Sequence, residues 1–110
     1  MTDILKALAD ETRLRIISQM FKGEMCVCEI EECLGLTQSN VSRHLNVLKK
    51  AGIFESYKTA QWTYYKISDE FIKNNEDLYK YLIIKIKELP FYEKDSENFS
   101  GCKLKNMCEN

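Results

Sequence analysis

Histidine, proline and glycine are scarce in this sequence, and it contains no long hydrophobic run. Its 110 residues include one histidine, one proline and four glycines. No apolar segment approaches the roughly 20 residues that a membrane-spanning helix needs. The N-terminal stretch MTDILKALADETR is too acidic for a signal peptide. We therefore expect no membrane segment and a location in the cytoplasm.

The missing residues and motifs also limit the kinds of catalytic and binding site that this chain can form. No glycine-rich phosphate loop is present, which removes the common nucleotide-binding motifs. A nucleophilic cysteine needs a nearby base, and the only histidine, His44, is distant in sequence from most of the cysteines. We therefore do not expect an enzyme. The five cysteines form an odd set, which in a cytoplasmic chain is more typical of thiols, metal ligands or redox groups than of a disulfide framework.

Charge is distributed unevenly along the chain. The formal net charge is −1, which alone argues against a nucleic-acid partner. Residues 1–35, however, carry a net charge of −3, residues 36–66 carry +4 and residues 67–110 carry −2. A basic middle segment between acidic ends is typical of a local nucleic-acid contact. The length suits one domain, which we place at residues 1–89, followed by a polar, cysteine-containing and mobile tail at 90–110.

Helical periodicity predicts a helix-turn-helix in the first half of the chain. A short first helix precedes a second one capped by Asp10. In the third, Cys28 is expected as the N-cap with Glu31 completing a capping box, and Gly35 ends it. The fourth begins after Thr37, and its exposed polar face can reach base edges and phosphates. The expected DNA-contacting residues of this segment are Thr37, Gln38, Ser39, Asn40, Ser42, Arg43 and His44.

The segment from Ile53 to Ile67 changes to a two-residue period, which predicts a β-hairpin. A hairpin that directly follows a recognition helix is a wing. We expect Lys58, Gln61 and Tyr64 to contact DNA from its exposed tip, with Trp62 beside them. The predicted fold is mainly α with a β-hairpin wing, a winged helix-turn-helix.

A long helix is predicted over Asp69–Leu89, ending before Pro90. Its apolar residues cover more of its circumference than one small core needs, which favours a homodimer. The expected interface combines this helix with the first helix. The interface residues are Ile4, Leu5, Leu8, Leu78, Leu82 and Ile86.

Three stretches resemble the ArsR/SmtB family of metal-responsive repressors. Residues 8–16, LADETRLRI, are similar to the family's LADPTRLRI, with Glu11 at the position of a common proline. Residues 39–52 resemble its recognition helix, and residues 24–29, EMCVCE, resemble the ELCVCD box of its arsenic- and cadmium-sensing members. The resemblance implies a dimeric winged-helix repressor on double-stranded DNA with an inverted-repeat operator. It also implies release when a toxic metal or metalloid binds. The wing tip, residues 58–61, lacks the family's usual Arg and Gly.

Cys26 and Cys28 are the primary candidate ligands. Thiolates are soft donors that select As(III), Sb(III), Cd, Pb, Cu(I) or Zn over hard cations. Positions two apart lie about 200° apart around a helix but share a face in extended chain. Joint ligation therefore favours a non-helical backbone at the start of the third helix.

A third ligand is open at this stage. In arsenic sensors with this box the next cysteine falls at the position that Glu31 occupies here. Cys102 and Cys108 in the predicted tail are candidates that could reach the pair within one chain or across the dimer. Cys33 is less favoured, because its position suits the core. The alternative function is a thiol-based switch of the same fold that responds to oxidants or reactive sulfur.

Overall fold

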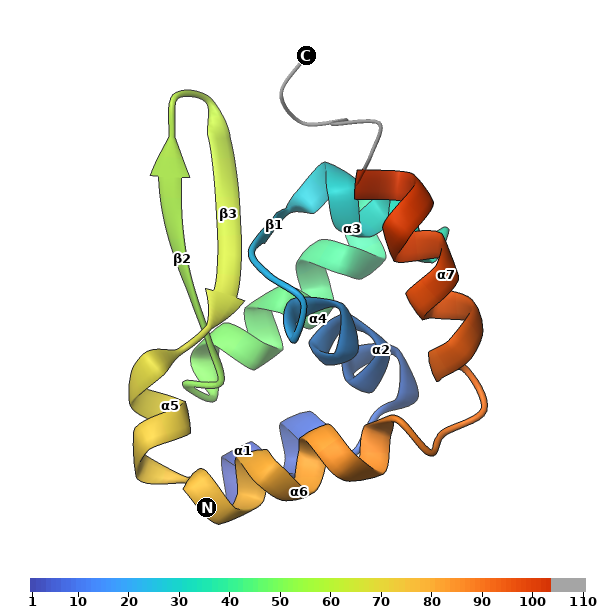
Figure 1. Cartoon of the computed structure of the whole chain (residues 1–110). Coiled ribbons are helices and arrows are strands. Elements are labelled where there is room, and N and C mark those ends of the chain that lie inside the picture. Colours follow the sequence, from blue (N-terminus) through green and yellow to red (C-terminus); the bar gives the residue numbers. More distant parts are fainter. Residues whose placement is uncertain (104–110) are drawn as a thin grey trace.

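The computed structural model describes residues 1–103. Its helices are α1 (Thr2–Leu8), α2 (Glu11–Met20), α3 (Val27–Leu34), α4 (Gln38–Lys50), α5 (Asp69–Asn74), α6 (Glu76–Ile86) and α7 (Tyr92–Lys103). Its strands are β1 (Met25–Cys26), β2 (Phe54–Thr59) and β3 (Trp62–Ile67). Figure 1 shows β2 and β3 projecting as a wing from a helical body. No helix among the described residues is long and apolar enough to cross a membrane.

The helix-turn-helix forms as predicted, with one shift in its start. Gly35 ends α3 in the left-handed conformation with φ of +66°, and the Thr37 side chain accepts a hydrogen bond from the Asn40 amide at the start of α4. The predicted cap at Cys28 is wrong, because Cys26 is the N-cap of α3 and Glu29 completes the capping box by accepting from the Cys26 amide. Strand pairing holds Cys26 extended, and the helix can begin only where that pairing stops.

The wing is part of a three-stranded antiparallel sheet with strand order β1-β3-β2. Tyr57 of β2 pairs with Tyr64 of β3, and Tyr64 pairs in turn with Cys26 of β1. The predicted hairpin is therefore confirmed, and the two-residue strand β1 is added at its edge. This strand joins the EMCVCE segment directly to the wing.

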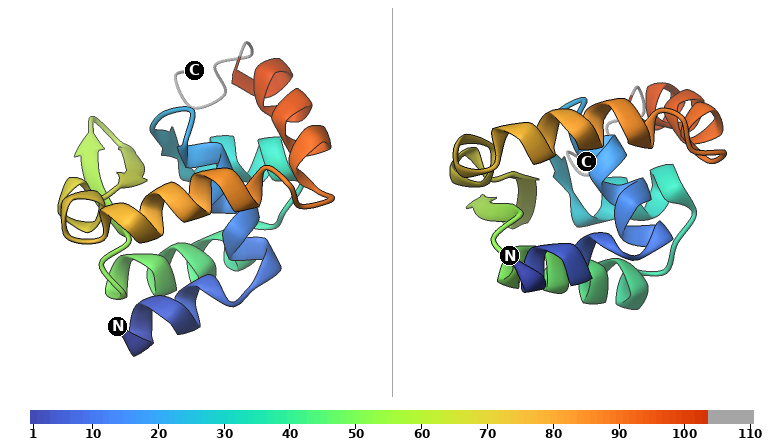
Figure 2. Two further views of the ribbon diagram at one scale, coloured as in Figure 1. Left: turned by 60° about the horizontal axis from the view of Figure 1, so that its bottom comes forward. Right: turned by 90° about the horizontal axis from the view of Figure 1, so that it is seen from below.

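The predicted helix over 69–89 is two helices. Asn75 interrupts it with φ of −138°, and its side-chain amide donates to the Phe71 carbonyl at the end of α5. Phe71 is buried, so α5 turns into the core before α6 begins. Figure 2 shows α6 and α1 along the same side of the molecule.

The residues expected at the dimer interface differ in their burial within the single chain. Leu8, Leu82 and Ile86 are buried in the core of their own chain, so they do not form an exposed interface. Ile4 and Leu78 are half-buried against the same core. The large apolar side chains that α1 and α6 leave exposed are Leu5, Tyr81 and Ile84.

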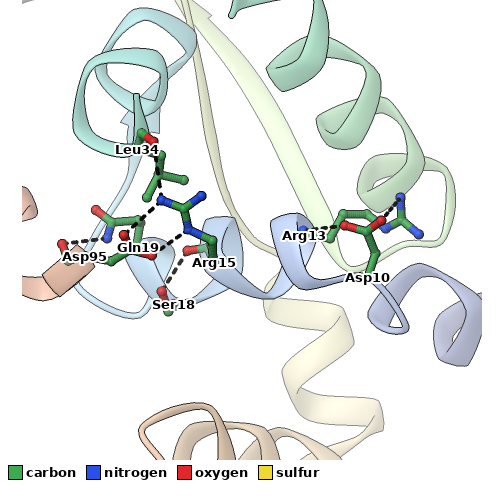
Figure 3. A network of polar contacts seen from close by, with 7 residues as sticks. All are labelled: Asp10, Arg13, Arg15, Ser18, Gln19, Leu34 and Asp95. Carbon is green, nitrogen blue, oxygen red and sulfur yellow. Dashed lines mark hydrogen bonds and ion pairs between the residues drawn. The ribbon is translucent and has the colours of Figure 1, made fainter. Parts of the chain in front are cut away.

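The expectation of a mobile tail from residue 90 is also wrong as far as residue 103. Residues 92–103 form α7, which packs against α2 and α3. Asp95 of α7 is buried and receives two hydrogen bonds from the Arg15 guanidinium, at 2.9 and 3.0 Å (Figure 3). Gln19 donates to the Asp95 carbonyl at 3.0 Å. These contacts dock a helix whose sequence is largely polar.

Candidate nucleic-acid interface and cysteine site

The start of α4 presents an exposed polar face. Thr37, Gln38, Ser39, Asn40, Ser42 and Arg43 are all exposed. Arg43 donates to the Asn40 side chain at 3.1 Å, one turn earlier on the same helix. These short donors and acceptors project from the N-terminal part of α4, next to the turn of the helix-turn-helix. In this position they can enter a major groove.

His44, which the sequence predicts as a DNA-contacting residue, does not belong to this exposed face. It is buried, and its Nδ1 lies 3.1 Å from the Arg13 guanidinium. Arg13 also donates to the carbonyls of Ala7 and Lys6 at the end of α1. Arg13 therefore joins α1 to the recognition helix through His44.

On the wing, Lys58 and Gln61 are exposed and Tyr64 is half-buried. The rings of Tyr57 and Tyr64 stack with centroids 5.7 Å apart. The Tyr57 hydroxyl donates to the carboxylate of Glu24, just before β1, and this bond raises the pKa of Tyr57 above its usual value. Sequence reasoning missed the Glu24–Tyr57 contact because it joins residues 33 positions apart.

Cys26 and Cys28 lie together at the start of α3. Their Sγ atoms are 3.1 Å apart. Cys26 is extended and buried, whereas Cys28 is half-buried in the first turn of the helix. The buried Glu29 carboxylate accepts from the Cys26 amide at 3.0 Å and fixes this change of backbone. Its spacing of three from Cys26 is the signal that could have located the cap.

A hollow of about 240 Å³ lies beside the two cysteines. Its walls come from the start of α3, the start of the recognition helix and the tip of the wing. The lining residues are Cys26, Val27, Cys28, Glu31, Gln38, Gln61, Trp62 and Thr63. The cysteine pair therefore shares one space with both elements expected to read DNA.

The sequence is similar to a known protein family and to individual members of it. The sequence pattern described as bacterial regulatory protein, arsR family, matches residues 10–56. An HTH-type transcriptional regulator of Methanocaldococcus jannaschii is 44% identical over 72 residues, which cover 64% of this chain and 81% of that protein. The chain belongs to the ArsR family of transcriptional regulators.

The relatives of this ArsR-family protein include metal-resistance regulators. The arsenical resistance operon repressor of Escherichia coli is 39% identical over 59% of this chain and 56% of its own length. Among solved structures, HlyU from Vibrio cholerae is 34% identical with a TM-score of 0.63, covering 74% of this chain and 88% of that chain. The chain spans little more than half of the E. coli repressor. These relatives are transcriptional regulators and not enzymes.

The remaining cysteines of this ArsR-family protein are placed differently. Cys33 is buried in the core on α3. Cys102 falls in α7, but its side chain, like all of Cys108, lies outside the described residues. Within the described part of the chain, no group of three or more His, Cys, Asp or Glu side chains is placed to hold a metal ion. Of the predicted ligands, the structure brings the sulfur atoms of Cys26 and Cys28 together.

His44 predicts a specific pH dependence for the stability of this ArsR-family protein. Burial lowers the pKa of His44 in the folded state, more than the nearby Asp10 raises it. Below about pH 6.5 the unfolded chain therefore binds a proton that the folded chain resists, and stability falls as pH falls. We expect a loss of at most about 1.4 kcal/mol at pH 5.5.

Urea denaturation at pH 7.5, 6.5 and 5.5 measures this loss. The chain has one histidine, so His44→Gln should flatten the profile over this range, whatever it does to stability at pH 7.5. An unchanged profile in the variant would assign the pH dependence to other groups.

Proposed function

We propose that this protein is a homodimeric repressor that acts in the cytoplasm. It binds an inverted-repeat operator and leaves it when a thiophilic metal or metalloid binds Cys26 and Cys28. The observation that carries the proposal is the 3.1 Å approach of the two sulfurs at the start of the helix that precedes the recognition helix. The ligand classes are As(III), Sb(III), Cd, Pb and Zn.

The DNA-binding part rests on charge and shape. The segment from residue 36 to 66, which contains the recognition helix and the wing, carries a net charge of +4. Phosphate contacts by such a segment release counterions, so affinity falls steeply with salt. In a dimer, two recognition helices enter major grooves about one helical turn, ~34 Å, apart, which requires an inverted repeat.

The homodimer is supported by the exposed apolar side chains of α1 and α6. Leu5, Tyr81 and Ile84 are 51%, 58% and 60% exposed in the single chain. A second copy that covers them would bury apolar surface symmetrically. A Mycobacterium bovis protein described as a homodimeric winged helix-turn-helix DNA-binding domain is 26% identical with a TM-score of 0.65, over 81% of this chain and 83% of that chain.

The sensing part rests on the position of the cysteines. Cys28 belongs to α3 and Cys26 to the strand before it, so a shared ligand couples the two elements. Since α3 packs against α4, a change at the N-terminus of α3 alters the packing that positions the recognition helix α4. A coupling of about 1–3 kcal/mol would weaken DNA binding roughly 5- to 150-fold.

The double variant C26S/C28S tests the proposal. We expect it to bind DNA as the wild type does but to retain it when arsenite, antimonite, Cd(II), Pb(II) or Zn(II) is added. Fluorescence anisotropy of a labelled duplex, selected from a random-sequence pool, measures the release. The assays contain a thiol-free reductant, because only reduced cysteines can act as thiolate ligands.

Single variants C33S, C102S and C108S assign a third ligand, since only a ligand should shift the metal dependence. Release of DNA from C26S/C28S by the same metal concentrations would refute the cysteine site. Release by oxidant with reversal by reductant, together with indifference to arsenite, would instead support the thiol-based redox switch.

A further inference from the structure

The wing is connected to the cysteine site by a row of residues across the sheet. Cys26 of β1 pairs with Tyr64 of β3, and Tyr64 pairs with Tyr57 of β2. Directly paired residues on antiparallel strands project to the same face, and the Tyr57 and Tyr64 rings stack there. Glu24 precedes β1, yet its carboxylate reaches across the middle strand to the Tyr57 hydroxyl. Both outer strands are thus tied to each other as well as to β3.

The cysteine pair bridges the strand and the helix. The Sγ atoms of Cys26 and Cys28 are 3.1 Å apart, one on β1 and the other on α3. A ligand that both sulfurs share would therefore act on both elements and would displace the one that is held less firmly.

The strand is the softer of the two supports. Cys28 belongs to α3, which Ile30 anchors in the core and which packs against α4 and α7. Cys26 belongs to a strand of two residues at the edge of the sheet. Because few backbone pairs hold such a strand, the displacement passes to β1 and through the sheet to the wing.

We propose that Glu24 and Tyr57 are positioning residues that transmit occupancy of the cysteine pair to the wing. This inference rests on the proposed function and adds the wing to the recognition helix as an output element. Gln61, Trp62 and Thr63 of the wing tip line the same hollow as the two cysteines, so wing and ligand compete for one space. Without the Glu24–Tyr57 bond, β1 is joined to the wing only through its two residue pairs with β3, so a smaller part of its displacement reaches β2.

The test compares Tyr57→Phe, Glu24→Ala and the double variant with the wild type. Tyr92→Phe is the matched control, since it removes a tyrosine hydroxyl on α7, away from the exposed apolar side chains of α1 and α6 and from the wing. Cd(II) is the probe, and the near-ultraviolet absorbance of the Cd–thiolate bond measures its binding. DNA release is the ratio of each variant's affinities for the selected duplex without and with Cd(II), so a changed metal-free affinity cancels.

We expect Cd(II) to bind all variants equally. The release ratio should fall at least threefold in Y57F and in E24A, without further loss in the double variant, and Y92F should match the wild type. Trp62 is the only tryptophan and lines the hollow, so its emission should change with Cd(II) in the wild type and less in Y57F. Full wild-type release ratios in Y57F and E24A would overturn the inference alone. A wild type that binds no Cd(II), or keeps its DNA, would overturn the proposed function and the inference with it.

Discussion

Asp95→Asn lowers the free energy of unfolding by about 2–4 kcal/mol, measured by urea denaturation at pH 7. Asp95 is buried, and both of its carboxylate oxygens accept hydrogen bonds from Arg15. This pairing raises the pKa of Arg15. An arginine is not deprotonated in proteins even without a partner, so the guanidinium keeps its charge when the carboxylate is gone. The variant leaves that charge partly buried without its counter-ion. The Arg15 side chain is 23% exposed, which places the cost below that of a fully buried pair.

Glu93→Gln is the matched control, because Glu93 is an exposed acid in the first turn of the same helix. We expect it to change stability by less than about 0.5 kcal/mol. Amide hydrogen exchange should also show α7 opening more often in D95N, while its rates in E93Q stay at the wild-type level. If D95N and E93Q were equally stable, α7 would not be held by the ion pair.

Ile84→Glu converts the dimer to a monomer at micromolar concentration, and its affinity for the selected DNA duplex falls at least about 100-fold. A glutamate at this position would bring an unpaired charge into an apolar interface, which costs several kcal/mol. In the single chain the side chain is 60% exposed, so the fold of each protomer is unaffected. Sedimentation velocity gives the oligomeric state, and circular dichroism confirms the fold.

Two controls separate shape from charge at this position. Ile84→Val keeps an apolar side chain and should remain dimeric. Lys80→Glu changes the charge of an exposed residue on the same helix by two units and should also remain dimeric. A dimer of I84E as tight as the wild type would place the interface elsewhere.

The parts of the fold with local signals could be predicted from the sequence. Asp10 and Thr37 cap α2 and α4. In each case the N-cap side chain accepts a hydrogen bond from the backbone amide three residues later, a contact that the start of any helix can provide. The hairpin follows from its two-residue period. In contrast, α7 has a polar sequence, and its docking depends on Arg15, 80 positions away.

The candidate site divides in the same way. The C-x-C spacing indicates that an extended backbone is needed for the two sulfurs to meet, and at Cys26 the backbone is extended. What makes it extended is β3, a strand 36 or more residues later, which no local pattern reveals. The sequence predicts His44 on the polar face because its neighbours are polar. In the structure its ring is instead in contact with Arg13 of another helix.

Helix α2 carries two arginines that point in opposite directions. Arg13 and Arg15 are two positions apart, about 200° around the helix, and Figure 3 shows them extending to opposite sides. One binds the end of α1 and His44 of the recognition helix, and the other binds Asp95 of α7 and the Leu34 carbonyl at the end of α3. If the elements on either side of α2 unfold locally, the arginine on that side therefore loses its hydrogen-bond partners. Partial unfolding carries an electrostatic cost on both sides of α2, which favours an all-or-none transition over gradual fraying.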